Sequence, residues 1–338
     1  DIVGRVVDPT GVALDGGAAV PKGKMMLLER IAPGVMTRQS VSVPLQTGIK
    51  AIDAMIPIGR GQRELIIGDR GTGKSAIAIG TILNQADQNM VCVYVSIGQK
   101  QSTLAQTKQI LEERGAMKYT TIVNASASAP ASLQFLAPYA GVAIAEYFMD
   151  QGKDVLVVYD DLTKHAWAYR EISLLLGRAP GRDSYPGDIF YLHSKMVERA
   201  AYLTDDLGGG SMTQFPIVET LEGDLTGYVQ SNLVSMTDGQ IYLSTPLFGE
   251  GQKPAVDLGL SVSRVGSKVQ WPAVKKLAGP LRLEFLQYRE VLRVSKLKTS
   301  GGSDEAENQL KSGGILTEIL KQERDHPVRS ETLVVILY

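Results

Sequence analysis

The sequence predicts an α/β fold, in which a mostly parallel sheet flanked by helices is followed by a smaller, partial α-helical domain. From about residue 46, short apolar strands alternate with longer helical stretches, and a Gly-rich segment joins one strand to the next helix. Beyond about Pro272 the pattern is helical. Alternating strands and helices imply crossover connections, which make the strands parallel and place helices on the sheet faces.

The first half of the chain predicts these elements in order. Residues 1–45 are rich in Gly, Pro and Val, which favours short extended pieces at Gly4–Val7 and Met25–Leu28 over helices. The next strands are predicted at Glu64–Ile67, Val91–Ile97, Thr120–Asn124 and Asp154–Tyr159. The helices between and after them are predicted from Lys74 onward and over Thr103–Arg114, Pro130–Gln151 and Leu162–Leu176.

The second half begins with a Pro/Gly-rich loop, Arg178–Asp188. The predicted elements that follow are a helix over Ile189–Thr204, a turn at Gly208–Gly210, strands over Gln214–Glu219, Asn232–Met236 and Gln240–Tyr242, and helices over Leu281–Val294, Glu305–Ser312 and Ile315–Gln322. The junction at Trp271-Pro272 is the predicted boundary between a first domain, 1–271, and a helical domain, 272–338. Residues 1–45 form a strand-rich N-terminal part of the first domain.

Composition excludes several classes of protein. The 338 residues carry a net charge of −1, with 44% hydrophobic and 21% charged residues, which argues against disorder and against binding nucleic acid by bulk charge. No apolar run is long enough to span a bilayer. Cys92 is the only cysteine, so no disulfide framework or thiolate metal cluster is expected. The histidines, His165, His193 and His326, lack metal-ligand spacing.

A complete phosphate-binding motif, G-x-x-x-x-G-K-[ST], opens the helix predicted from Lys74. Its residues are Gly68, Asp69, Arg70, Gly71, Thr72, Gly73, Lys74 and Ser75. In such a loop, backbone N–H groups and the helix N-terminus surround phosphate oxygens, and glycines allow the close approach. Lys74 is expected to reach the β- and γ-phosphates, and the Ser75 hydroxyl to bind Mg²⁺.

A carboxylate that completes the phosphate site is predicted where the strand Asp154–Tyr159 ends. The apolar run is followed by Asp160 and Asp161. A carboxylate at this place is what the Mg²⁺ of a phosphate-binding loop requires, usually through a coordinated water. Asp160 is predicted on the metal side, whereas Asp161 is expected to cap the next helix.

At these residues the chain resembles the alpha subunits of rotary F-type ATP synthases over essentially its whole length. The matching stretches are Gly68–Ser75, Tyr94–Gln106, Tyr159–Arg170, Arg178–Arg199, Met236–Gln240 and Gly259–Ser267. The resemblance implies a RecA-like P-loop NTPase domain between an N-terminal β-barrel and a C-terminal helical domain. Because the barrel and the end of the helical domain have no counterpart in this sequence, the chain is expected to be a fragment.

The resemblance also implies a division of labour between two kinds of subunit. In the catalytic beta subunits, a Glu follows the strand after the P-loop helix, where this chain has Gln99. A neutral amide cannot accept a proton at neutral pH, so the site is expected to bind Mg-ATP and turn it over poorly. Gln does position water in some GTPases, which leaves that role open.

Further residues are assigned by the resemblance alone. Arg264, in Ser-Val-Ser-Arg-Val-Gly, is expected to enter the neighbouring beta site as an arginine finger. The adenine side is expected at Lys253-Pro254, where the family has Arg-Pro, and at Gln322, the one Gln kept from a Lys-Gln-x-Gln-like segment. Gly71 replaces a Gln that contributes to the Mg²⁺ shell. The loop Arg178–Asp188 resembles one that faces the central shaft.

The function implied is that of a nucleotide-binding, mainly non-catalytic subunit of a proton- or sodium-translocating ATP synthase. Its cofactors are ATP or ADP and Mg²⁺. Its partners are catalytic beta subunits in an alternating ring, the central-stalk gamma subunit and the peripheral-stalk delta subunit, with no nucleic acid. It is expected as a peripheral membrane protein on an energy-transducing membrane, the bacterial cytoplasmic face or its organelle equivalent, held through the membrane-embedded sector.

Two other kinds of P-loop protein are alternatives to this function. One is a self-sufficient hexameric ATPase of the flagellar-export or transcription-terminator type, which Gln99 and the lack of a basic or aromatic RNA-binding stripe disfavour. The other is a P-loop kinase or transferase, for which no acceptor site or lid is recognisable in the sequence.

Overall fold

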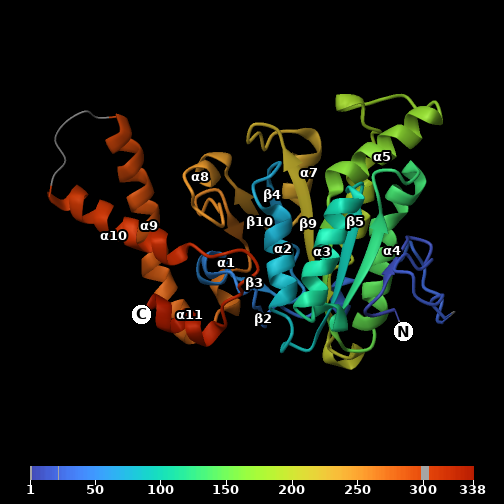
Figure 1. Cartoon of the computed structure of the whole chain (residues 1–338), viewed down its shortest axis with the longest axis horizontal. Coiled ribbons are helices and arrows are strands. Elements are labelled where there is room, and N and C mark those ends of the chain that lie inside the picture. The colour runs from blue at the N-terminus through green and yellow to red at the C-terminus, as the bar shows by residue number, and fades with distance from the viewer. Residues whose placement is uncertain (1, 22, 298–303) are drawn as a thin grey trace.

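The computed structural model describes residues 2–21, 23–297 and 304–338. A mixed, mostly parallel sheet forms its centre, with strands in the order β1-β6-β5-β7-β9-β4-β10-β11 and β8 beside β9 (Figure 1). The strands are β1 Val6–Val7, β4 Leu65–Asp69, β5 Met90–Ile97, β6 Thr120–Ala125, β7 Asp154–Asp160, β8 Ala201–Tyr202, β9 Ser211–Thr220, β10 Gly239–Leu243 and β11 Val262–Ser263. A separate antiparallel pair joins β2 Pro44–Leu45 to β3 Ile58–Gly59.

Helices cover the sheet and extend beyond one edge. Their bounds are α1 Lys50–Met55, α2 Lys74–Leu83, α3 Gln101–Glu113, α4 Ala131–Met149, α5 Leu162–Leu175, α6 Ile189–Val197, α7 Tyr228–Met236, α8 Thr245–Gly249, α9 Pro272–Leu297, α10 Asp304–Leu320 and α11 Ser330–Leu337. Figure 1 shows α9, α10 and α11, in red, gathered beside the sheet domain. The predicted α/β fold with a following helical part is confirmed.

Two hydrophobic cores lie on the two faces of the sheet. Successive side chains of a strand point to opposite faces, so Tyr94 packs in the core that includes α1 and α2, and Val95 in the core that includes α4 and α5. Both faces are buried, which explains why β5 and β7 read as continuous apolar runs. Among the helices that the structure describes, none is long and apolar enough to cross a bilayer.

Two predicted strands are wrong. The segment Met25–Leu28 forms no strand, and the side chains of Met25 and Leu27 are 91% and 73% exposed. The segment Asn232–Met236 is the end of helix α7, where Val229, Leu233 and Met236 are buried at helical spacing. Over a window of five residues, its mixture of apolar and polar residues fits both the strand period of two and the helix period of 3.6. Packing of the buried residues on one helix face decides for the helix.

Two helix predictions also require correction. The helix expected to reach Thr204 ends at Val197, and the chain turns inward so that Arg199 forms a buried bidentate pair with Glu146, at 2.8 and 2.6 Å. The two helices expected at Glu305–Ser312 and Ile315–Gln322 are one helix, α10. Gly313 lets α10 pass close to Tyr288, since a Cβ there would lie 2.0 Å from the Tyr288 ring.

Candidate functional site

The loop between β4 and α2 has the backbone shape that the phosphate-binding motif requires. Gly71 and Gly73 have φ of +82° and +103°, the left-handed region that favours glycine, and a Cβ on either would meet open space. Gly68 is needed for a different reason, because a Cβ there would lie 2.5 Å from the carbonyl oxygen of Leu243 on neighbouring β10. The loop is therefore open toward a ligand and tightly packed behind.

Lys74 supplies a buried cation to this loop. Its side chain is 6% exposed, and Nζ donates to the carbonyl oxygens of Gly68 at 2.8 Å and Asp69 at 2.7 Å. Burial lowers the pKa of the ammonium, while the carboxylates of Glu219 and Asp161 act in the opposite direction. No acidic side chain in the described part of the chain pairs with it directly. A buried ammonium held only by carbonyl oxygens fits an anionic ligand such as a phosphate.

The Asp69 carboxylate holds the loop in place through hydrogen bonds to neighbouring segments. Its Oδ1 accepts from Thr220 Oγ1 at 2.6 Å and from the Gly223 N–H at 2.8 Å, and its Oδ2 accepts from Thr245 Oγ1 at 2.7 Å. Thr72 Oγ1 donates to the Asp69 carbonyl oxygen at 2.7 Å. These contacts tie the loop to the ends of β9 and β10, so Asp69 shapes the site and leaves ligand binding to its neighbours. Arg70 is exposed on the outer side.

At the end of β7, Asp160 meets two side chains from β5 and the turn after it. The carboxylate is 3% exposed; its Oδ2 accepts from the Tyr94 hydroxyl at 2.5 Å and its Oδ1 accepts from Gln99 Nε2 at 3.0 Å. Asp161 caps α5, as predicted, by accepting from the Lys164 N–H at 2.9 Å. Burial raises the pKa of Asp161 to about 6.

The donor set at this edge of the sheet fits Mg²⁺. The Ser75 hydroxyl, in the first turn of α2, has no hydrogen-bond partner among the described residues, and Asp160 adds a carboxylate. Both are hard oxygen ligands of the kind Mg²⁺ prefers. Within the described residues, no group of three His, Cys, Asp or Glu side chains could hold a metal ion. The protein therefore contributes only part of a coordination shell, which is normal for a Mg²⁺ ion shared with phosphates and water.

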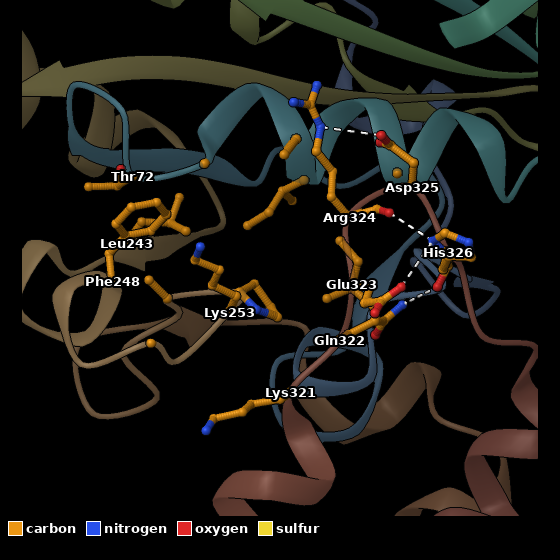
Figure 2. Close-up of a pocket in the computed structure, with 18 of the residues that line it drawn as sticks. Thr72, Leu243, Phe248, Lys253, Lys321, Gln322, Glu323, Arg324, Asp325 and His326 are labelled. Atoms are coloured by element: carbon orange, nitrogen blue, oxygen red, sulfur yellow. Dashed lines mark hydrogen bonds and ion pairs between the residues drawn. The ribbon is translucent and has the colours of Figure 1, made fainter.

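A cavity of about 670 Å³ adjoins the loop (Figure 2). It lies between α2, the segment after α8 and the segment 321–327 that joins α10 to α11. Gly71, Thr72 and Gly73 line one end, and Lys321 to Pro327 line the other. The volume is in the range of ligand sites for small molecules. The phosphate loop thus opens into a space built partly by the C-terminal helices.

Two family models match the chain. The description "ATP synthase alpha/beta family, nucleotide-binding domain" matches residues 48–263, and "ATP synthase alpha/beta chain, C terminal domain" matches residues 270–338. The chain belongs to the ATP synthase alpha/beta family. Among curated relatives, the ATP synthase subunit alpha of Dehalococcoides mccartyi strain BAV1 is 57% identical over 337 residues. That of Clostridium kluyveri strain NBRC 12016 is 57% identical over 341 residues. Each alignment covers 100% of this chain and 67% of the relative.

The residues that the resemblance assigns to the adenine side have an unexpected arrangement. Gln322 lines the cavity, yet its Oε1 accepts from the Lys50 N–H at 2.9 Å, and its Nε2 donates to the carbonyls of Gly48 and His326, each at 2.7 Å. The Gln322 amide thus fastens segment 321–327 to the start of α1. Lys253, which lines the cavity with Pro254, places its ammonium 5.0 Å from the Phe248 ring centroid.

Arg264 lies apart from this cavity. It follows β11 at the edge of the sheet, its side chain is exposed, and its backbone N–H donates to the Asp238 carbonyl at 2.8 Å. It is absent from the cavity lining within the described residues. The structure therefore brings together Lys74, Ser75, Gln99 and Asp160, and leaves Arg264 exposed and apart from them.

Proposed function

We propose that this chain binds Mg-ATP or Mg-ADP and acts as a mainly non-catalytic alpha subunit of an ion-translocating ATP synthase. Residues 1–271 form its nucleotide-binding domain and residues 272–338 its helical domain. The proposal rests above all on the buried Lys74 ammonium, which has only carbonyl partners and belongs to the loop whose residues Gly71, Thr72 and Gly73 line the 670 Å³ cavity. The family match and the relatives named ATP synthase subunit alpha support it.

In this proposal the chain's own residues hold the nucleotide at its two ends. The backbone N–H groups of residues 68–75 and the Lys74 ammonium bind the phosphates, and the cavity accommodates the base. Ser75 and Asp160 hold Mg²⁺, the latter through water. When bound there, Mg²⁺ would neutralise charge on the phosphates.

Gln99 makes this site poor at hydrolysis. A general base must accept the proton of the attacking water, and the Gln99 side chain donates its N–H to Asp160 at 3.0 Å. An amide has no proton-accepting form at neutral pH. We therefore infer that bound ATP persists at this site, and that its role is structural or regulatory.

Catalysis in the assembly depends on Arg264 of this chain. Its exposed position beyond β11 suits a guanidinium that enters a neighbouring catalytic beta subunit and stabilises charge on the transferred phosphoryl group. Beta and gamma subunits are the proposed direct partners. The delta subunit and the membrane-embedded sector complete the assembly, which places this chain at the surface of an energy-transducing membrane, with protons or sodium ions as the transported species.

The replacement Lys74→Ala tests the nucleotide site. It should abolish binding of Mg-ATP by the whole chain, because the buried cation facing the phosphates is removed, and isothermal titration calorimetry measures the loss. Lys108→Ala, in α3 and outside the cavity lining, is the matched control and should bind normally. Retained micromolar affinity in Lys74→Ala would contradict the site. Steady-state ATP hydrolysis by the chain alone at a rate of ~1 s⁻¹ or more, a typical enzyme turnover, would contradict the non-catalytic role.

A further inference from the structure

A buried glutamine links the start of β4 to the turn that carries Arg264. Gln62 lies just before β4 and is 0% exposed. Its Nε2 donates to Ser263 Oγ at 3.1 Å and to Glu64 Oε2 at 2.7 Å, and its Oε1 accepts from the Gly59 N–H at 2.8 Å. Both donors and the carbonyl oxygen of this amide are therefore in use, which fixes the orientation of the side chain.

Ser263 connects Gln62 to the turn that contains Arg264. Besides accepting from Gln62, its hydroxyl donates to the Pro57 carbonyl oxygen at 2.6 Å and accepts from the Gly266 N–H at 3.2 Å. The bond to Gly266 closes the turn, because it joins the residue before Arg264 to the second residue after it. The hydroxyl therefore uses its donor and both of its acceptor positions.

The neighbouring strand holds the backbone of Arg264 as well. The Arg264 N–H donates to the carbonyl oxygen of Asp238, which stands immediately before β10, at 2.8 Å. Strand β10 is parallel to β4 and pairs with it (Figure 1), so both contacts come from the amino ends of two adjacent strands. The Arg264 side chain is exposed, whereas the backbone from which it projects is held on two sides.

Glu64 adds a buried acceptor that faces the Gln62 amide. Its side chain is 0% exposed, and its Oε1 is a buried oxygen without a hydrogen-bond partner in the described part of the chain. A Cβ on Gly239 would lie 2.6 Å from Glu64 Oε2, so the carboxyl group packs directly against the start of β10. Burial raises the pKa of Glu64 well above its ordinary value, while the bond from Gln62 and the nearby charge of Arg264 act in the opposite direction.

The place that the Arg264 guanidinium reaches depends on this backbone. A long side chain on a mobile turn would spread its charged end over many positions, and ordering it beside a phosphoryl group would cost more entropy. A displacement of about 1 Å in a group that acts on the reaction can lower the rate about 100-fold. A turn fixed by buried hydrogen bonds keeps the guanidinium within a narrow range.

We propose that Gln62, oriented by Glu64 and acting through Ser263, is a positioning residue for Arg264. It sets the turnover of the neighbouring catalytic site without contacting nucleotide in either site. The proposal rests on the proposed function, because it needs Arg264 to act in a catalytic beta subunit. Within the described residues, the cavity lining includes none of the three positioning side chains, so nucleotide binding by this chain should not depend on them.

Two variants break the link at its two ends. Ser263→Ala removes the hydroxyl from a half-buried residue, and Gln62→Met removes both amide donors at similar length. In a complex reconstituted with catalytic beta subunits, each should lower the multi-site kcat about tenfold, the value of one well-made buried hydrogen bond, and leave KM for ATP unchanged. Ser263→Thr keeps a hydroxyl at a strand position and should retain wild-type turnover. Ser267→Ala, which removes an exposed hydroxyl just beyond the turn, is the matched control.

Combination with Arg264→Ala distinguishes positioning from a general structural effect. In the Arg264→Ala background, Gln62→Met should cause no further loss of turnover, since no guanidinium is left to position. A further tenfold loss in that background would mean that Gln62 supports the complex in another way, and it overturns the positioning role.

The outcomes separate this inference from the proposed function. Unchanged turnover in Ser263→Ala and Gln62→Met, together with a large loss in Arg264→Ala, overturns the positioning role and leaves the finger standing. Unchanged turnover in Arg264→Ala overturns the proposed finger, and the positioning role with it. If Gln62→Met does not fold, the comparison of Ser263→Ala with Ser263→Thr decides, and equal turnover of these two variants overturns the proposal.

Discussion

At the scale of single residues, the proposed Mg²⁺ side of the site contains a small hydrogen-bonded group around Asp160. The Tyr94 hydroxyl donates to Asp160 Oδ2 at 2.5 Å, and Gln99 Nε2 donates to Oδ1 at 3.0 Å. Burial and the adjacent carboxylate raise the pKa of Tyr94 well above its ordinary value, so the phenol stays a donor at every working pH. Tyr94 thereby fixes the orientation of Asp160.

Replacing Tyr94 by Phe should weaken Mg²⁺ binding about tenfold, the usual size of the effect of a residue that orients a metal ligand. The Phe ring keeps the packing and removes only the hydroxyl. Titration of Mg²⁺ into the chain with ATP present measures the change, while binding of metal-free ATP should be unaltered. Tyr191→Phe removes an exposed hydroxyl and serves as control. An unchanged Mg²⁺ dissociation constant would show that Asp160 needs no help from Tyr94.

The residues that sequence alone can predict are those that share one local segment. Gly68 to Ser75 are consecutive, so their geometry follows from the motif, and Asp160 follows from an apolar strand that ends in carboxylates. Tyr94, Thr220 and Thr245 could not be predicted in the same way. Their partners depend on which strands are neighbours, and the order β5-β7-β9-β4-β10 is a property of the folded sheet.

At the scale of elements, α5 and α6 are joined by two buried histidines. His165 Nδ1 and His193 Nε2 are 3.0 Å apart, and the Phe135 ring stacks on His165 with centroids 5.4 Å apart. Burial lowers the pKa of His165 to about 4, and that of His193 is lowered as well. The pair is therefore neutral in the folded protein at neutral pH.

This pair should make the protein less stable as the pH falls from 6.5 to 4. In that range the unfolded chain binds a proton at His165 that the folded chain does not, so the free energy of unfolding falls with falling pH. The variant His165→Asn keeps a hydrogen-bonding group near His193 and cannot titrate. Its unfolding free energy should depend less on pH, by up to ~1.4 kcal/mol per pH unit.

Urea unfolding at several pH values measures this difference. The buried carboxylates Asp53 and Asp161, with pKa values raised to about 6, act in the opposite direction within the same pH range, so only the comparison of wild type and variant isolates the histidines. His326→Asn, with an exposed side chain, should follow the wild type. Identical pH dependence of wild type and His165→Asn would mean that His165 has the same pKa in the folded and the unfolded chain.

Elements differ in how far their sequences define them. Long strands and helices with a clear period, such as β5 and α4, are predicted well because many residues carry the same signal. The end of α7 and the break after α6 are decided by tertiary contacts, namely helical packing of Leu233 and the buried Arg199–Glu146 pair. Such contacts involve residues far apart in the chain, which a local pattern does not contain.

At the scale of the whole molecule, Arg264 and the nucleotide cavity belong to different surfaces. Arg264→Ala should therefore leave ATP binding by this chain unchanged. In a complex reconstituted with catalytic beta subunits it should reduce multi-site turnover by about 10³-fold or more, the range known for arginine fingers. Coupled ATPase assays on the complex measure the loss, and Lys268→Ala, exposed in the turn that follows, is the control. Unchanged turnover would exclude the finger.

The bonds of Gln322 have a mechanical consequence. They attach segment 321–327, at the far end of the cavity, to Gly48 and Lys50 at the start of α1, whereas the near end is the loop that follows β4 of the central sheet. A nucleotide bound in the cavity would contact both the loop after β4 and segment 321–327. It would therefore oppose movement of the C-terminal helices away from the sheet. A displacement of the helices would change the distance between the two ends of the cavity. The residence time of the nucleotide should therefore depend on the position of the C-terminal helices.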